Sequence, residues 1–201
     1  PYSMSGISWI YGGPAGAGAV GAGDGGSGNT GGNAYGIYLN STNRNSAAKN
    51  IYNNRIYWIY GGAGSAGGAG GLYYTGDGGN GGSPGNATGI DLYNSKNCNI
   101  TNNDIQYLWG AAEGAGGAGA WWNTEIQNFI SAFLSWMDLD EYYDSYFPET
   151  NGSNGGDGGN GGSGIKGGNS KGINTWVASN LNVSNNTIRY IMPGAGSAGA
   201  A

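Results

Sequence analysis

Few side chains in this sequence are suited to catalysis. The chain contains no histidine, which removes the most common general base and the most common transition-metal ligand. The remaining candidates for acid–base chemistry are Asp91, Asp104, Arg55 and Arg189, which occupy outward strand or turn positions in the predicted elements and form no clear cluster. Hydrolases that act through carboxyl groups need a paired set. We therefore expect ordinary solvated charges here, and no enzyme.

The sequence also offers little for a metal or cofactor. Cys98 is the only cysteine, so neither a disulfide framework nor a cysteine metal cluster is expected. An Asp-Gly-Gly phrase recurs at Asp24, Asp77 and Asp157, where Ca²⁺ binding is one interpretation and a solvated turn the favoured one. The glycine runs lack the Gly-Lys-Ser/Thr ending of a phosphate-binding loop. We expect no cofactor.

Charge and sequons point to the cell exterior. The net charge is −5 and the Lys and Arg residues are few and scattered, so nucleic acid is not an expected partner. No apolar run reaches the 18 residues of a membrane span. Asn-x-Ser/Thr triplets, which are acceptors for N-glycosylation, begin at Asn40, Asn86, Asn99, Asn151, Asn182 and Asn185. We therefore expect an extracellular or cell-surface glycoprotein.

An internal repeat organises the chain. A phrase with two aliphatic residues recurs four times, and a Gly-rich stretch follows each copy: Ile7-Ser-Trp-Ile10, Ile56-Tyr-Trp-Ile59, Ile105-Gln-Tyr-Leu108 and Ile188-Arg-Tyr-Ile191. Three copies follow a longer match of strand-like alternation, with an Asn-Asn pair that indicates a turn: Asn50-Ile-Tyr-Asn-Asn-Arg-Ile56, Asn99-Ile-Thr-Asn-Asn-Asp-Ile105 and Asn182-Val-Ser-Asn-Asn-Thr-Ile188. Each unit predicts strand, turn, strand, Asn-Asn turn and strand, which is one coil of a solenoid.

The N-x-I-x-N-N-x-I coils resemble those of the right-handed parallel β-helix family, in particular its pectate-lyase-like branch. The resemblance implies inward stacks of Ile, Leu and Val, with asparagine ladders at the turns. It also suggests a further function, that of a polysaccharide lyase or hydrolase, which we favour less.

Glycine recurs at every third position between the coils. The clearest run is Gly61, Gly64, Gly67 and Gly70, and the phase resumes at Gly76 after a four-residue interruption. A period of three indicates polyproline-II-type geometry, in which one row of side chains is missing so that backbones can approach. The runs resemble the polyglycine-II bundles of an insect antifreeze protein and of phage fibre adhesins. We expect hairpin arms packed as a bundle, with flexible linkers as the alternative.

The predicted fold is an all-β solenoid of parallel β-helix coils with Gly-rich polyglycine-II hairpin arms, forming one domain over residues 1–201. The predicted segments are coils at 1–11, 33–60, 86–109 and 170–192, arms at 12–32, 61–85, 110–120, 151–169 and 193–201, and a helical tip insert at 121–150.

The tip insert has no glycine, holds 6 of the 12 acidic residues, and contains no Lys or Arg. Part of it follows helical spacing. We interpret it either as a lid over the arms or as an interface with another subunit or a target, and a membrane-surface helix is less favoured. The residues expected to interact are Trp121, Trp122, Ile126, Phe129, Ile130, Phe133, Trp136, Met137, Tyr142, Tyr143, Tyr146 and Phe147.

The function expected from the sequence is structural. We expect a subunit of an extracellular filament or surface layer that associates with itself through stacked repeats and the tip insert. The alternative is an adhesin that binds a glycan or a cell surface through exposed Tyr and Trp side chains.

Overall fold

The computed structural model describes residues 6–20, 24–40, 48–70, 77–119 and 167–196, and in these ranges the protein is all-β. The predicted tip insert and its interaction residues lie outside them. The strands are short, and ten are present in the described ranges: β1 (Ile7–Tyr11), β2 (Ala34–Asn40), β3 (Lys49–Tyr52), β4 (Arg55–Tyr60), β5 (Ala87–Tyr93), β6 (Lys96–Thr101), β7 (Asp104–Trp109), β8 (Ser170–Trp176), β9 (Ser179–Ser184) and β10 (Thr187–Met192).

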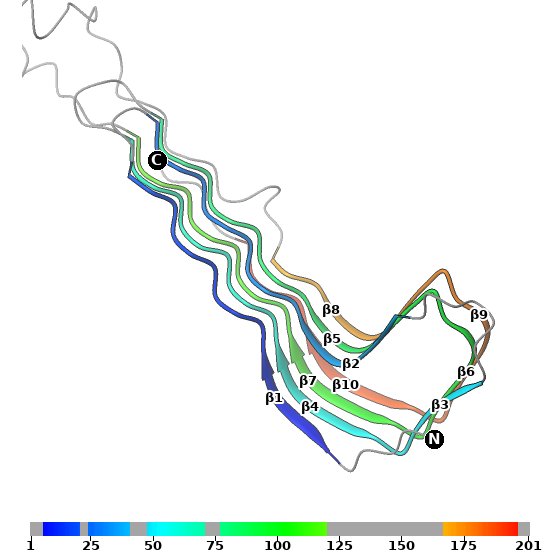
Figure 1. Ribbon diagram of the computed structural model, residues 1–201. Coiled ribbons are helices and arrows are strands. Elements are labelled where there is room, and N and C mark those ends of the chain that lie inside the picture. Colours follow the sequence, from blue (N-terminus) through cyan, green and yellow to red (C-terminus); the bar gives the residue numbers. More distant parts are fainter. Residues whose placement is uncertain (1–5, 21–23, 41–47, 71–76, 120–166, 197–201) are drawn as a thin grey trace, which may run out of the picture.

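The strands form three parallel sheets around one core. Their orders are β1-β4-β7-β10, β2-β5-β8 and β3-β6-β9, so each sheet takes one strand from each turn of the chain. Figure 1 shows these turns stacked on one another, with the Gly-rich segments extending together from one corner. This is the architecture of a β-solenoid, in which each turn contacts mainly its two neighbours.

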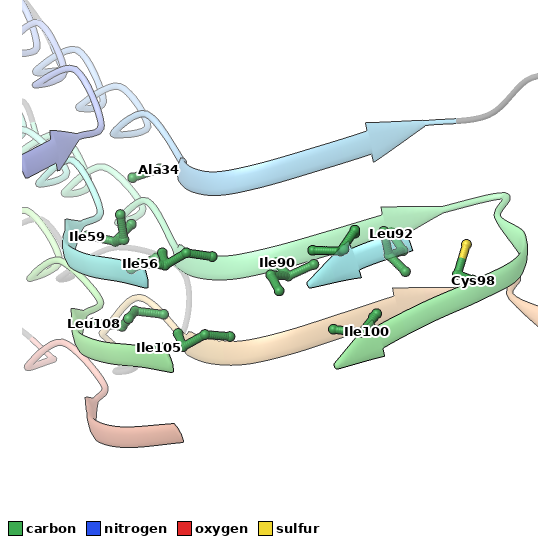
Figure 2. Packing of buried hydrophobic residues seen from close by; sticks show 11 residues of the cluster. Ala34, Ile56, Ile59, Ile90, Leu92, Cys98, Ile100, Ile105 and Leu108 are labelled. Carbon is green, nitrogen blue, oxygen red and sulfur yellow. The ribbon is translucent and has the colours of Figure 1, made fainter. Parts of the chain in front are cut away.

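The core consists of aliphatic side chains stacked in register. Ile56 of β4 pairs with Ile105 of β7, and Ile59 pairs with Leu108. All four are fully buried, and Figure 2 shows Ile56 above Ile105 and Ile59 above Leu108. A glycine within β5 makes room for this stack, because a Cβ on Gly89 would lie 2.6 Å from the Ile105 Cγ2 atom. The predicted inward stacks are confirmed.

Asparagine shapes the turn before the last strand of each coil. Asn53, Asn102 and Asn185 adopt left-handed φ angles of 56°, 56° and 54°, which asparagine tolerates better than most residues. The asparagine that follows each of them points inward. Asn54 Nδ2 donates to Asn103 Oδ1 over 2.8 Å, and Asn103 Nδ2 donates to Asn186 Oδ1 over 2.9 Å. The asparagine ladder predicted from the sequence is confirmed.

One turn carries a residue that fits its backbone poorly. Val177 has a φ of 52°, at the place where the preceding coil has Asn94 with a φ of 50°. A β-branched side chain is strained there, and Val177 is 57% exposed, so it gains little from burial.

We therefore expect Val177→Asn to stabilise the protein by about 1 kcal/mol, because asparagine relieves the left-handed strain. Denaturant unfolding of the two proteins measures this difference. Asn94→Val is the reciprocal control and is expected to destabilise by a similar amount, and an unchanged midpoint in both variants would contradict the interpretation.

The Gly-rich arms are joined by backbone hydrogen bonds with a period of three. In residues 61–70, every third N–H donates to the next outgoing arm, as in Gly64 to Ala112 and Gly67 to Ala115. The following row donates to a returning arm, as in Gly62 to Gly32 and Gly68 to Gly26. The arms therefore form two layers, which run side by side away from the coils in Figure 1. This pattern satisfies backbone groups that an isolated three-residue helix leaves unpaired.

Side-chain size follows the same period. Ala63, Ala66, Ala112, Ala115 and Ala118 belong to the row that faces away from the bundle. The glycine rows face the neighbouring backbones. Glu113 is an exception, because it occupies a glycine row, is 7% exposed, and has an Oε2 atom without a hydrogen-bond partner among the residues that the structure describes.

Candidate interaction surface

The four copies of the Ile-x-x-Ile phrase place an unusual residue on the outer face of one sheet. Trp9, Trp58, Tyr107 and Tyr190 have left-handed φ angles of 62°, 63°, 59° and 55°. Bulky aromatic residues rarely adopt this conformation. It resets the inward–outward alternation, so in the phrases of β1, β4 and β7 both aliphatic residues lie in or against the core although they are three positions apart. In the β10 phrase Ile191 packs against the core and Ile188 is exposed. The aromatic residue between them remains on the outside.

These four residues form the first of two aromatic ladders on the sheet β1-β4-β7-β10. The ring centroids of Trp9 and Trp58 are 5.1 Å apart, those of Trp58 and Tyr107 4.4 Å, and those of Tyr107 and Tyr190 4.8 Å. Interplanar angles of 5°, 8° and 6° show that the rings are parallel. Strained conformations that recur at one position are found mostly where function or packing requires them.

The second ladder lies beside the first. Tyr11 stacks on Tyr60 at 4.9 Å, and Tyr60 stacks on Trp109 at 4.8 Å. The position that follows in β10 is Met192. Trp109 also contacts Trp58 at 5.6 Å, which joins the ladders into one surface.

The stacking direction decides which part of each ring is accessible. A ring in the middle of a ladder has neighbours on both faces, so mainly its edge is free. The end rings keep one free face, and Trp9, Tyr11 and Tyr190 are 60%, 61% and 52% exposed. Recognition that needs an aromatic face is therefore confined to the two ends of the surface.

A polar group beside the ladders links neighbouring strands. Tyr57 in β4 donates a hydrogen bond from its hydroxyl to Asp104 Oδ2 in β7, and Gln106 Nε2 donates to Asp104 Oδ1 over 2.6 Å. The hydrogen bond to Asp104, burial and the nearby carboxylate charge raise the pKa of the Tyr57 phenol. Burial and the proximity of Tyr11 raise the pKa of Tyr60, and burial raises the pKa of the Cys98 thiol.

These shifts predict a loss of stability at alkaline pH. Each group is neutral when protonated, and the folded state favours the protonated form. Its contribution to the free energy of unfolding is therefore fully present at pH values below the unfolded-state pKa. It decreases as pH rises beyond about 9 for cysteine and about 10 for tyrosine. We expect the free energy of unfolding to fall between pH 9 and 11, and denaturant titrations at each pH measure it.

Tyr57→Phe is the matched control for this prediction. The variant lacks the titrating phenol, so its stability should be lower at pH 7 and should fall less steeply with pH. A wild-type profile that stays flat through pH 11 would contradict the interpretation.

The charged residues considered for catalysis lie on two sheets: Arg55, Asp104 and Arg189 are on β1-β4-β7-β10, where Arg55 and Asp104 are register partners, and Asp91 is on β2-β5-β8. Asp91 accepts a hydrogen bond from Asn174 Nδ2 over 2.8 Å on the sheet β2-β5-β8, whereas Asp104 lies on the sheet β1-β4-β7-β10. Asp24 Oδ1 accepts the Asp77 N–H over 2.9 Å in the returning arms. Within the part of the chain that the structure describes, no three His, Cys, Asp or Glu residues gather as a metal site would require. These ranges also contain no helix of the length and apolarity that spanning a membrane requires.

The sequons differ in accessibility. Asn40, Asn182 and Asn185 are exposed. Asn86 and Asn99 take part in side-chain ladders, with Nδ2 donating to Asn33 and Asn50 respectively. Asn151 lies outside the described ranges.

The ladders are the main feature that the sequence analysis missed. Their signal was present, because each phrase carries an aromatic residue before its second aliphatic residue, and three of the four carry another directly after it. Two inward residues spaced by three cannot belong to a regular strand, which is a sequence sign of the left-handed residue between them.

The last described turn of the solenoid, β8 to β10, leaves core positions open. Ile56 and Ile105 are fully buried, but Ile188, their equivalent in β10, is 44% exposed. Val183 in β9 is 49% exposed, whereas its partner Ile100 is fully buried. Between outgoing arms, every third N–H donates toward the next turn, as in Gly12 to Tyr60 and Gly61 to Trp109. One end of the outgoing layer therefore presents acceptors and the other presents donors.

No protein-family model, curated protein or solved structure matches this chain significantly, so its assignment rests on the geometry described above.

Proposed function

We propose that the protein is a structural subunit of an extracellular filament or surface layer, built as parallel β-helix coils with polyglycine-II arms. The observation that carries the proposal is the continuity of the stack. Hydrogen bonds, aliphatic stacks and aromatic ladders all run along the same axis through the described turns. Among the described residues, β1 and β10 are the outer strands of their sheet, and core positions Val183 and Ile188 of the last turn are exposed without a cap, an open edge that favours addition of another copy.

The two ends are complementary in the sheet β1-β4-β7-β10. Its outer strands are β1 and β10, so a second copy can add its β1 to β10 by parallel pairing. The free faces of Trp9 and Tyr190 would then continue one ladder, and Tyr11 would lie against Met192. The outgoing arms would pair donors with acceptors in the direction already used within the chain.

Other features restrict this contact. Pro193 occupies the first donor position of the last outgoing arm, where Gly61 and Gly110 donate in the preceding arms, and proline has no N–H to donate. The other two sheets have three strands instead of four. When β1 of the next copy pairs with β10, a gap one strand wide therefore separates β8 and β9 from β2 and β3 of that copy. The contact therefore depends on one sheet and its arms.

Electron microscopy and light scattering at increasing protein concentration test self-assembly. We expect Ile188→Lys to prevent it, because the substitution puts a charge on an exposed core position of β10, the strand to which the next copy adds. Tyr93→Lys is the control, since Tyr93 is an exposed residue of β5 in an inner turn. Particles that stay monomeric at high concentration would overturn the proposal, as would assembly that Ile188→Lys leaves unchanged.

A second candidate function is glycan binding, which the exposed faces of Trp9 and Tyr11 favour. Their ladders are adjacent, and sugar rings stack on aromatic faces rather than on edges. A glycan array with the monomeric protein tests this function, and Trp9→Ala should abolish any binding that it detects.

A further inference from the structure

The order of Tyr and Trp in the ladders is not uniform along the solenoid. In the first ladder two tyrosines are adjacent only at the step from β7 to β10, where Tyr107 stacks on Tyr190. In the second ladder they are adjacent only at the step from β1 to β4, where Tyr11 stacks on Tyr60. At the middle step each ladder pairs a tyrosine with a tryptophan. The tyrosine pairs therefore join the two edge strands of the sheet to their inner neighbours.

Each tyrosine pair is close and accessible. The ring centroids are 4.9 Å apart for Tyr11 and Tyr60 and 4.8 Å for Tyr107 and Tyr190, and both pairs have interplanar angles of 6°. Tyr11 and Tyr60 are direct partners in the strand register, which brings their rings side by side on the same face of the sheet. Tyr11 is 61% exposed and Tyr190 is 52% exposed, which gives an oxidant in solution access to one member of each pair.

We propose that Tyr11–Tyr60 and Tyr107–Tyr190 are sites of oxidative cross-linking, each forming a dityrosine bond that ties an edge strand to the solenoid. The co-reactant is a one-electron oxidant, such as a peroxidase with hydrogen peroxide. Each phenol loses one electron and one proton, and the two radicals form a carbon–carbon bond between ring positions ortho to the hydroxyls. The hydrogens at these positions move to the oxygens, and two tyrosines with one hydrogen peroxide give one dityrosine and two waters.

The bonds would act where the fold is weakest. β1 and β10 have no partner on their outer side among the described strands, and edge strands fray before central ones. A bond between strands of different turns restricts the unfolded chain as a disulfide does. Disulfides within the chain are not available for this purpose, because Cys98 is the only cysteine and is buried. The biological role rests on the proposed extracellular function, where oxidants are available, but the chemistry rests on the ladder geometry alone.

Peroxidase and hydrogen peroxide, applied to dilute protein, test the proposal. Light scattering verifies that the protein is monomeric at the concentration used, so cross-linking is measured independently of assembly. We expect dityrosine fluorescence within single chains, and peptide mapping should find Tyr11 joined to Tyr60 and Tyr107 joined to Tyr190, each pair lighter by two hydrogens. The thermal midpoint of the oxidised monomer should be higher than that of the untreated protein.

Phenylalanine variants supply the controls, because phenylalanine keeps the stacked ring and lacks the phenol. Tyr11→Phe should remove the first linked pair, Tyr190→Phe the second, and the double variant most of the fluorescence and the rise in midpoint. Tyr93→Phe, an exposed tyrosine outside the ladders, should change neither. Tyr35 and Tyr38 also approach each other, at 5.2 Å, but a bond between them would stay within β2. Linked peptides dominated by other tyrosines, or a midpoint that does not rise, would overturn the proposal.

Discussion

Gly82→Ala is expected to destabilise the arm bundle by about 3 kcal/mol or more, since its methyl group would overlap a backbone that cannot move aside. A Cβ on Gly82 would lie 1.8 Å from the Asn29 carbonyl oxygen and 2.6 Å from its carbon. Gly82 also donates to the Ser65 carbonyl over 2.7 Å and accepts from Gly114 over 2.9 Å. Moving Gly82 aside would therefore break backbone hydrogen bonds to the arms on both sides of it.

Gly13→Ala is the control that tests whether overlap with a neighbouring backbone causes the loss of stability. A Cβ on Gly13 meets nothing within 4 Å, so alanine there should stabilise by about 0.5 kcal/mol by reducing the freedom of the unfolded chain. Hydrogen exchange at the Gly114 amide reports on the bundle directly, and denaturant unfolding reports the free energies. Equal effects of the two substitutions would show that the arms are not closely packed.

Asn103→Ala is expected to cost about 3 kcal/mol or more, because it removes the centre of the buried asparagine ladder. Asn103 is 1% exposed. Its Oδ1 accepts from the Asn54 backbone N–H and side-chain amide over 3.1 and 2.8 Å, and its Nδ2 donates to the Ile51 carbonyl over 3.0 Å. Alanine removes the acceptor that Asn54 uses and the donor that Ile51 uses, inside a core that admits little water.

Asn174→Ala is the matched control for the ladder. Asn174 makes one hydrogen bond to Asp91 and one with Lys171 on the outside of the solenoid, where water can replace both. Its loss should cost no more than about 0.5 kcal/mol. Urea unfolding of both variants provides the comparison. A ladder variant as stable as the control would mean that the buried amides contribute little to the fold.

Much of the coil could be read from the sequence because its signals are local. Inward Ile and Leu at alternating positions, and the Asn-Asn pairs that tolerate left-handed geometry, depend on neighbouring residues only. The same holds for Gly61, Gly64 and Gly67, whose spacing shows a three-residue period without any partner. A repeated local pattern then predicts stacking, since each turn has to cover the apolar face of the next.

The sequence alone determined that the chain is a repeat of short parallel strands with glycine-periodic arms, since period and residue type are properties of one segment at a time. The tertiary structure decided which glycines are indispensable, because Gly82 and Gly13 differ only in what lies beside them. It also decided that Trp58 and Tyr107 are rungs of a ladder, that their faces are covered, and that tyrosine pairs fall at the two edge strands. These properties depend on the register between turns, which brings together residues about fifty or more positions apart, and no single segment carries that information.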